Sequence, residues 1–219
     1  MKSLLVGLVA ILAFAPNAYA LNIVHDEAVN GDLSSENLNP TQLSLSVGSN
    51  HIIGSTTGNP NLDRDFFSLT VPSGYLLNKI ILANYIGLDD DGPNQGFFGV
   101  QAGSNIETAT VNANTPPLLG AALIGAAPGT QVGENVLDDL GVANPIRGAF
   151  FVGFPSGNLS EGTYTFWVQE TKRGIQNYDL DFVVTAVPEP SNILGIGAAV
   201  SFAAVLKRKK SLHLARFGK

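Results

Sequence analysis

Two groups of aspartates are the residues whose type and spacing best suit chemistry in this chain. Asp89-Asp90-Asp91-Gly92 is the densest acidic site, and Asp63 and Asp65 lie two residues apart in a strand-like segment. Calcium takes about six to eight oxygen ligands, and closely spaced aspartates beside a glycine turn supply several of them. We therefore expect a Ca²⁺ site among Asp63, Asp65, Asp89 and Asp91.

The acidic residues near residue 30 extend this hypothesis. Asp63 and Asp65 point to one face of a strand, where Asp26, Glu27 and Asp32 can join them in space. The spacing does not match an EF-hand, because the acids do not alternate and no glutamate closes the loop. The alternative for each residue is a solvated turn or strand end, since aspartate is itself a turn former.

Catalytic residues are not indicated by any motif. The chain contains no cysteine, which excludes thiol chemistry, disulfides and thiolate-bound zinc. His25 and His51 are the only histidines of residues 21–186, and the Gly-x-Ser-x-Gly motif of esterases is absent. The glutamates lie in no context that would separate a protonated acid from an ionised partner. We predict no catalytic residue.

Trp167 is the candidate for binding a glycan. In the segment 163–169, Tyr164, Phe166 and Val168 alternate on one side, so Trp167 lies on the opposite face. An exposed aromatic ring there would stack on a sugar, which makes Trp167 the expected platform. The alternative is that the indole packs beneath a loop.

The elements that must position these residues are predicted to be strands. Apolar alternation, β-branched and aromatic residues, and frequent turn residues are typical of an all-β, antiparallel β-sandwich. Strands are expected over residues 41–47, 66–71, 77–86, 97–101, 148–152, 163–171 and 178–186. The segment 112–145 is predicted to be mostly loop, with one short helix over 135–140.

The charge of this central part differs from that of the whole chain. Residues 21–186 hold five basic and seventeen acidic side chains, a net charge of −12, whereas the whole chain carries −6. A surface this acidic repels the phosphate backbone, so nucleic acid is excluded as a partner.

The first twenty residues form the pattern of a signal peptide. Lys2 precedes an apolar run over 4–14, Pro16 ends it, and Ala18-Tyr19-Ala20 has the small-x-small form that signal peptidase cleaves. We expect cleavage after Ala20, which makes residues 1–20 the signal peptide and signal peptidase a partner.

The C-terminal residues have a second targeting pattern. Val187-Pro188-Glu189-Pro190 precedes an apolar run from Ile193 to Leu206, and the basic cluster Lys207, Arg208, Lys209 and Lys210 follows. Fourteen residues of helix cover roughly 21 Å, which is short for a hydrocarbon core of about 30 Å. The basic cluster is expected to stay in the cytoplasm, with residues 211–219 as a short cytoplasmic tail.

This order of motif, apolar helix and basic cluster over 187–210 resembles the PEP-CTERM family of exported bacterial proteins. The resemblance implies recognition and processing by the membrane enzyme exosortase. It implies a protein at the cell surface or outside the cell, anchored transiently or stably in the inner membrane. The alternative is an ordinary membrane anchor that is never cut.

The central domain, residues 21–186, resembles bacterial pre-peptidase C-terminal-like domains over roughly residues 26–186, most clearly in two segments. These are Asp63-Arg64-Asp65-Phe66-Phe67-Ser68-Leu69-Thr70-Val71-Pro72-Ser73-Gly74 and Gly162-Thr163-Tyr164-Thr165-Phe166-Trp167-Val168-Gln169. The resemblance implies a jelly-roll-like sandwich, an accessory or carbohydrate-facing role without catalysis, and calcium binding in some members.

The expected function is therefore that of an exported surface or matrix protein without enzymatic activity, associated with extracellular polysaccharide. The alternative is a small secreted hydrolase, acting on polysaccharide or ester substrates, whose catalytic residues are scattered along the sequence.

Overall fold

The computed structural model describes residues 22–88, 95–107, 118–125, 131–141 and 157–187. The strands are β1 (Ile23–Asp26), β2 (Thr41–Ser44), β3 (His51–Thr57), β4 (Arg64–Val71), β5 (Tyr75–Leu88), β6 (Gln95–Ala102), β7 (Gly120–Gly125), β8 (Gly162–Glu170) and β9 (Ile175–Ala186). Two short helices, α1 (Glu27–Asn30) and α2 (Val136–Gly141), complete the described elements.

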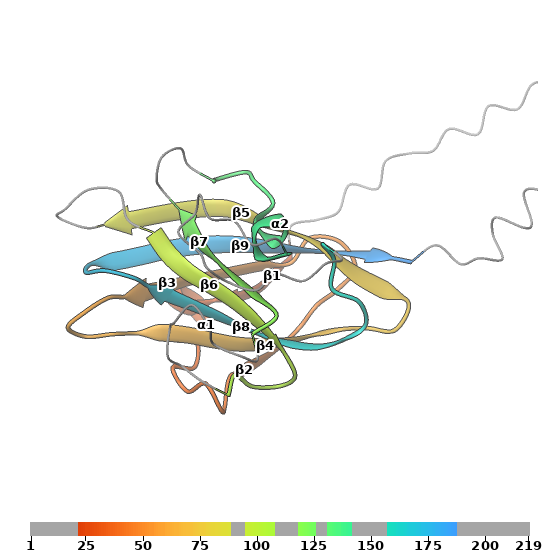
Figure 1. Cartoon of the computed structure of the whole chain (residues 1–219), viewed down its shortest axis with the longest axis horizontal. Helices are drawn as coiled ribbons and strands as arrows, with labels where there is room; N and C mark the ends of the chain where they lie inside the picture. The colour runs from red at the N-terminus through yellow and green to blue at the C-terminus, as the bar shows by residue number, and fades with distance from the viewer. Residues whose placement is uncertain (1–21, 89–94, 108–117, 126–130, 142–156, 188–219) are drawn as a thin grey trace, which may run out of the picture.

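The strands form two sheets that pack face to face (Figure 1). One sheet has the order β1-β3-β9-β5 and the other the order β2-β4-β8-β6-β7. Strands β1 and β2 lie at one side of the sandwich, next to α1, whereas α2 contacts β5 and β7 at the opposite side. The two helices therefore lie at opposite edges of the sandwich.

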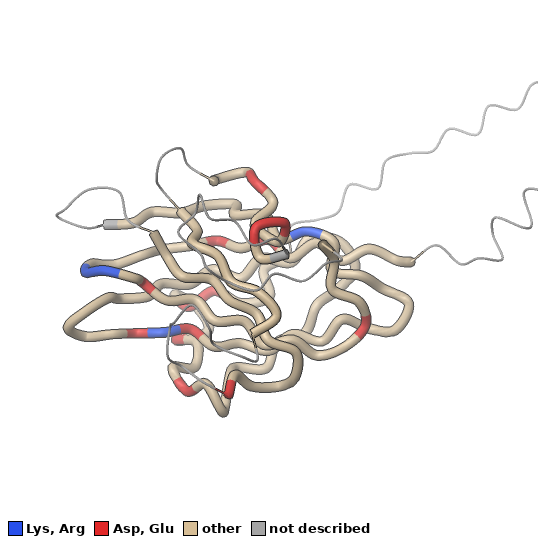
Figure 2. The backbone as a smooth tube through the Cα atoms, viewed as in Figure 1, with Lys and Arg blue, Asp and Glu red and all other residues tan. Residues whose placement is uncertain are grey.

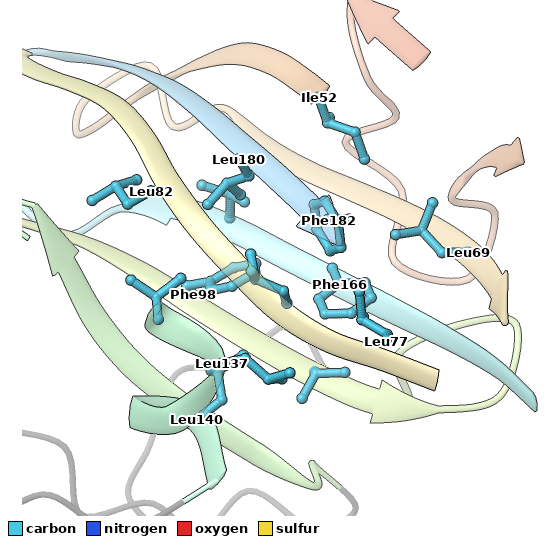
Figure 3. Close-up of a cluster of buried hydrophobic side chains, with 14 of the residues drawn as sticks. Ile52, Leu69, Leu77, Leu82, Phe98, Leu137, Leu140, Phe166, Leu180 and Phe182 are labelled. Atoms are coloured by element: carbon cyan, nitrogen blue, oxygen red, sulfur yellow. The ribbon is translucent and has the colours of Figure 1, made fainter. Parts of the chain in front are cut away.

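The main core lies between the sheets and is built by period-two alternation (Figure 3). Phe67 of β4 is the cross-strand partner of Phe166 of β8 within one sheet. Leu69 belongs to the same core, and Leu180 and Phe182 of β9 meet it from the other sheet. The rings of Phe166 and Phe182 are 5.0 Å apart at an interplanar angle of 78°. Edge-to-face pairs of this kind add about 0.5–1.5 kcal/mol beyond area burial.

A second, smaller apolar cluster lies on the outer face of the five-stranded sheet. It consists of Phe66, Phe97, Ile106, Ala121 and Trp167, with Leu118 packed against it. Phe66 and Trp167 are direct cross-strand partners, with ring centroids 5.5 Å apart. This face is therefore covered and holds a core of its own.

The N-terminal strap, residues 22–34, crosses from one sheet to the other. At its start, β1 pairs in parallel with β3, and the His51 amide donates to the Asn22 carbonyl. At its end, Ser34 forms a bridge with Phe66 of β4, and Leu33 is buried in the main core. The strap thus connects the two sheets at the side of the sandwich where β1 and β2 form the edges.

Much of the predicted fold is confirmed, and one feature needs correction. The architecture is all-β in two facing sheets, and the expected helix is present as α2. The sandwich is not purely antiparallel, because β1 pairs in parallel with β3 and β2 with β4. β1 and β2 each run beside a strand to which no tight hairpin connects them, so their direction is not constrained to be antiparallel.

Three strands were not predicted as elements of their own. β1 has only four residues, and β3 contains a glycine, a serine and two threonines that hide its apolar alternation. β7 lies inside the segment 112–145, which was predicted to be mostly loop. The expected strand 148–152 lies outside the described residues. So do both targeting segments, with their expected terminal helices, apart from Val187. Within the described residues no helix is both long and apolar enough to cross a membrane.

Candidate functional site

Three carboxylates converge where the strap meets the two sheets. Glu27, Asp32 and Asp65 each offer an oxygen, and these oxygens all lie within 4.8 Å of one another. Glu27 opens α1, Asp32 follows α1 by two residues, and Asp65 is the second residue of β4. Two oxygens on opposite sides of a Ca²⁺ ion are about 5 Å apart, so the group has the dimensions of a calcium site.

Asp65 forms the floor of this carboxylate group. It is in phase with Phe67 and Leu69, so its side chain points inward between the sheets, where it is fully buried. Its Oδ2 accepts a hydrogen bond of 2.6 Å from the Tyr178 hydroxyl of β9. Its Oδ1 is buried and has no hydrogen-bond partner within the described structure. A buried carboxylate oxygen without a partner is costly, and a cation would satisfy it.

Glu27 is half-buried and held from two directions. Its Oε1 accepts from the Leu33 amide at 3.1 Å, and its Oε2 accepts from the Ser55 amide of β3 at 2.6 Å. The Ser55 hydroxyl also donates to Oε2, at 3.2 Å, whereas Oε1 keeps a further lone pair because a carboxylate oxygen accepts about two hydrogen bonds or metal contacts. These bonds fix the carboxylate beside the floor and tie the strap to β3.

The other acids of the neighbourhood have separate roles. Asp32 is exposed and forms the rim of the group. Asp63 lies just outside it, and its Oδ1 accepts from the Ser35 hydroxyl at 3.0 Å. Asp26 instead caps α1 by accepting from the Ala28 amide. The group therefore opens to solvent on the side of Asp32.

The electrostatics of the group favour a bound positive charge. Burial raises the pKa of Asp65 well above its ordinary value, and the nearby Glu27 carboxylate raises it further. Burial also raises the pKa of Glu27, although its backbone hydrogen bonds oppose the increase. Burial raises the pKa of the Tyr178 hydroxyl, with the charge of Asp65 as the second cause. Without a cation, the group therefore holds protons more tightly than isolated carboxylates do.

The sequence-predicted metal ligands are thus placed unequally. Asp65 is a member of the group, Glu27 and Asp32 join it in space as expected, and Asp63 lies beside it. Asp89 and Asp91 lie outside the described residues, as do Ala18, Ala20 and all of the C-terminal signal from Pro188 to Lys210, including Glu189 and Pro190. For those positions the sequence interpretation remains a prediction.

Trp167 is not placed as a glycan platform. Its side chain is fully buried between Phe66 and Phe97, 4.6 Å from the Phe97 ring centroid. The expectation that it faces away from Phe166 is correct, but this outer face is covered. The alternative interpretation, packing beneath other residues, describes its environment. Its Nε1 has no hydrogen-bond partner in the described part of the chain.

The two histidines lie in ordinary structural contacts. His51 Nδ1 is 2.7 Å from Asp179 Oδ1, and its Nε2 is 3.8 Å from Asp181 Oδ2 on the neighbouring strand β9. His25 Nε2 lies 3.0 Å from the Gly31 carbonyl oxygen. Among the residues with described positions, no serine or threonine hydroxyl bonds to either ring. The Ser49 hydroxyl donates to Asp181 instead.

Tyr178 is the one residue of the site that the sequence interpretation missed. It was assigned only to the expected strand 178–186. The available signal was phase, because Tyr178 shares the inward face with Leu180 and Phe182 just as Asp65 shares that of Phe67. Two polar groups on opposed inward faces must find partners, and here each is the partner of the other.

Comparisons of the whole chain with protein-family models, with curated proteins and with solved structures found no match.

Proposed function

We propose that this chain is an exported, non-enzymatic β-sandwich protein of the cell surface or extracellular matrix, whose N-terminal strap is held on the sandwich by Ca²⁺. The observation that carries the calcium part is that Asp65 belongs to a group of three carboxylates while its buried Oδ1 has no partner in the described residues. A cation completes this group, whereas water alone would leave several acidic oxygens facing one another.

Calcium fits this donor set better than a softer metal does. All three donors are carboxylates, and hard oxygen ligands favour Ca²⁺ or Mg²⁺ over zinc or copper. Glu27 and Asp65 are fixed by hydrogen bonds to the protein, so the coordination shell cannot easily rearrange to an ideal octahedron. Ca²⁺ tolerates irregular geometry, whereas Mg²⁺ demands a nearly regular one.

Export and sorting are supported by the position of the C-terminal motif. Strand β9 ends at Ala186, and the Val187 amide still donates to the Gly74 carbonyl at the edge of the sandwich. The Pro188-Glu189-Pro190 motif follows at once, so the expected processing signal begins directly after the last described strand. In this proposal residues 1–20 are removed by signal peptidase, and an exosortase-type enzyme acts on the tail.

Two experiments test the two parts of the proposal. Intact-mass spectrometry of the protein recovered from the cell surface should give a mass that begins after Ala20 and ends near Pro190. A mass that retains Lys219 would mean an uncut anchor. Thermal unfolding in calcium and in chelator should give a higher midpoint with calcium, because a ligand that binds only the folded state stabilises it.

A secreted hydrolase is the second candidate, favoured by the contact between His51 and Asp179. A carboxylate that orients a histidine is part of hydrolytic triads, but a hydroxyl nucleophile must lie on the other ring nitrogen. Here that nitrogen faces Asp181. Turnover on polysaccharide or ester panels that is lost in His51→Gln would favour this candidate over the first.

A further inference from the structure

We propose that the calcium ion held by Glu27, Asp32 and Asp65 binds a neutral polysaccharide directly, through two adjacent hydroxyl groups of one sugar. This inference rests on the proposed function, because it requires a cation at the carboxylate group. It adds the chemical class of the partner and the place where the partner binds.

The protein supplies fewer free oxygens than a calcium ion requires. Three carboxylates provide between three and six ligand atoms, but Asp65 Oδ2 is occupied by the Tyr178 hydroxyl and both Glu27 oxygens already accept backbone amides. Ca²⁺ requires about six to eight ligands. Several coordination positions therefore remain for oxygens from outside the group.

The open coordination positions of the ion face solvent. Asp65 is fully buried and closes the site from below, and Glu27 closes the side that faces β3. Asp32 is exposed, so the remaining positions point toward solvent beside it. Water fills them in the absence of a partner, and a partner that offers two oxygens at once replaces two waters.

The net charge of the occupied site decides between neutral and anionic partners. Three ionised carboxylates carry −3 against the +2 of the ion, so the occupied site keeps a net negative charge. Asp63 beside it and the charge of −12 over residues 21–186 add to this. Among the described residues, Figure 2 shows acidic positions on many elements and basic positions at few places. An anionic polymer is repelled by such a surface, whereas neutral hydroxyl oxygens complete the shell without adding charge.

The carboxylate group is a better place for a sugar than the described aromatic residues, because most of these are buried. Trp167 is buried, and Tyr75 and Tyr164 are the only described aromatic residues that are not. The Tyr164 hydroxyl donates to the Ser160 carbonyl beside its own strand. Recognition through hydroxyl groups at the ion therefore does not compete with an exposed aromatic platform within the described structure.

The test is binding of the full chain to soluble mannan, galactan and dextran, with polygalacturonate as the charged comparison. Each polymer is measured in calcium and in chelator, alongside the thermal midpoint of the same samples. Asp32→Asn keeps the size of the side chain but removes its charge and so weakens binding of the ion. Asp138→Asn, on the exposed face of α2, removes the same charge at the opposite edge of the sandwich. Asp138→Asn is the matched control.

We expect at least one neutral polymer to bind in calcium, to be released by chelator, and to bind at least about tenfold more weakly to Asp32→Asn. Asp138→Asn should bind as the unmodified chain does. If calcium raises the midpoint but no neutral polymer binds, this inference is wrong while the calcium site stands. If calcium changes neither midpoint nor binding, both fail. Binding that persists in chelator, or that favours polygalacturonate, also overturns the inference.

Discussion

The Tyr178 hydroxyl donates a hydrogen bond of 2.6 Å to Asp65 Oδ2 and thereby joins the two sheets through the interior of the sandwich. Tyr178 belongs to β9 of the four-stranded sheet and Asp65 to β4 of the five-stranded sheet. Glu27 of the strap offers an oxygen within 4.8 Å of one from Asp65, and its Oε2 accepts from the Ser55 amide of β3. The strap therefore meets both sheets at this carboxylate group, where the proposed ion lies.

Removing the tyrosine hydroxyl tests this link. Tyr178→Phe should lower the free energy of unfolding in chelator by about 1–3 kcal/mol, because Asp65 Oδ2 then loses its donor inside the core. Calcium should recover part of this loss, since the ion contacts the same carboxylate. The measurement is urea unfolding in both conditions. Tyr164→Phe, whose hydroxyl bonds to the Ser160 carbonyl near the surface, is the control and should change stability much less.

The stability of the calcium-free protein should depend on pH through Asp65. Burial raises the pKa of Asp65 in the folded state above its ordinary 3.8, so the folded state binds more protons than the unfolded state between the two values. The free energy of unfolding should therefore fall as pH rises through that window. Unfolding midpoints in chelator at a series of pH values measure this decline.

Two comparisons separate Asp65 from other acids. Asp65→Asn should flatten the decline, because the side chain no longer ionises, and it should also weaken the stabilisation by calcium. In the unmodified chain, calcium should reduce the decline, since the ion takes the place of the proton. A decline that is equally steep in Asp65→Asn would assign the pH dependence to other groups.

Gly54 of β3 leaves the space that the Tyr178 ring occupies. A Cβ at this position would meet the Tyr178 hydroxyl oxygen and would lie 2.6 Å from its Cζ. Gly54→Ala should therefore displace the ring and lower the free energy of unfolding by about 1–3 kcal/mol. In the double variant with Tyr178→Phe the two losses should be less than additive, because both variants break the same contact. Fully additive losses would show that the ring moves aside without losing its bond.

Trp167 is the only tryptophan of the chain, so its fluorescence reports one environment. Because the side chain is fully buried between Phe66 and Phe97, we expect blue-shifted emission that acrylamide quenches poorly. Trp167→Ala should lower the free energy of unfolding by about 3–5 kcal/mol. Efficient quenching in the folded protein, or a change of emission when mannan binds, would instead return Trp167 to the surface as a sugar platform.

Local sequence patterns were sufficient for the strands with a regular alternation. In the central parts of β8 and β9 every second residue is apolar, and Phe166, Leu180 and Phe182 lie in the core as the pattern predicts. The same alternation correctly placed Trp167 on the opposite face. It could not predict that this face is covered, because the covering residues, such as Ile106 and Leu118, are far from Trp167 in the sequence. A strand pattern specifies two faces, and only long-range packing decides which of them meets water.

The acidic site shows the same division. The sequence by itself determined the acidic composition and the all-β alternation, and it indicated Asp65 as a candidate metal ligand. Only the tertiary structure decided that Glu27 and Asp32 meet Asp65, and that Tyr178 meets it from 113 residues away. Contacts between strands of different sheets depend on how the sheets are stacked, and no local periodicity encodes that arrangement.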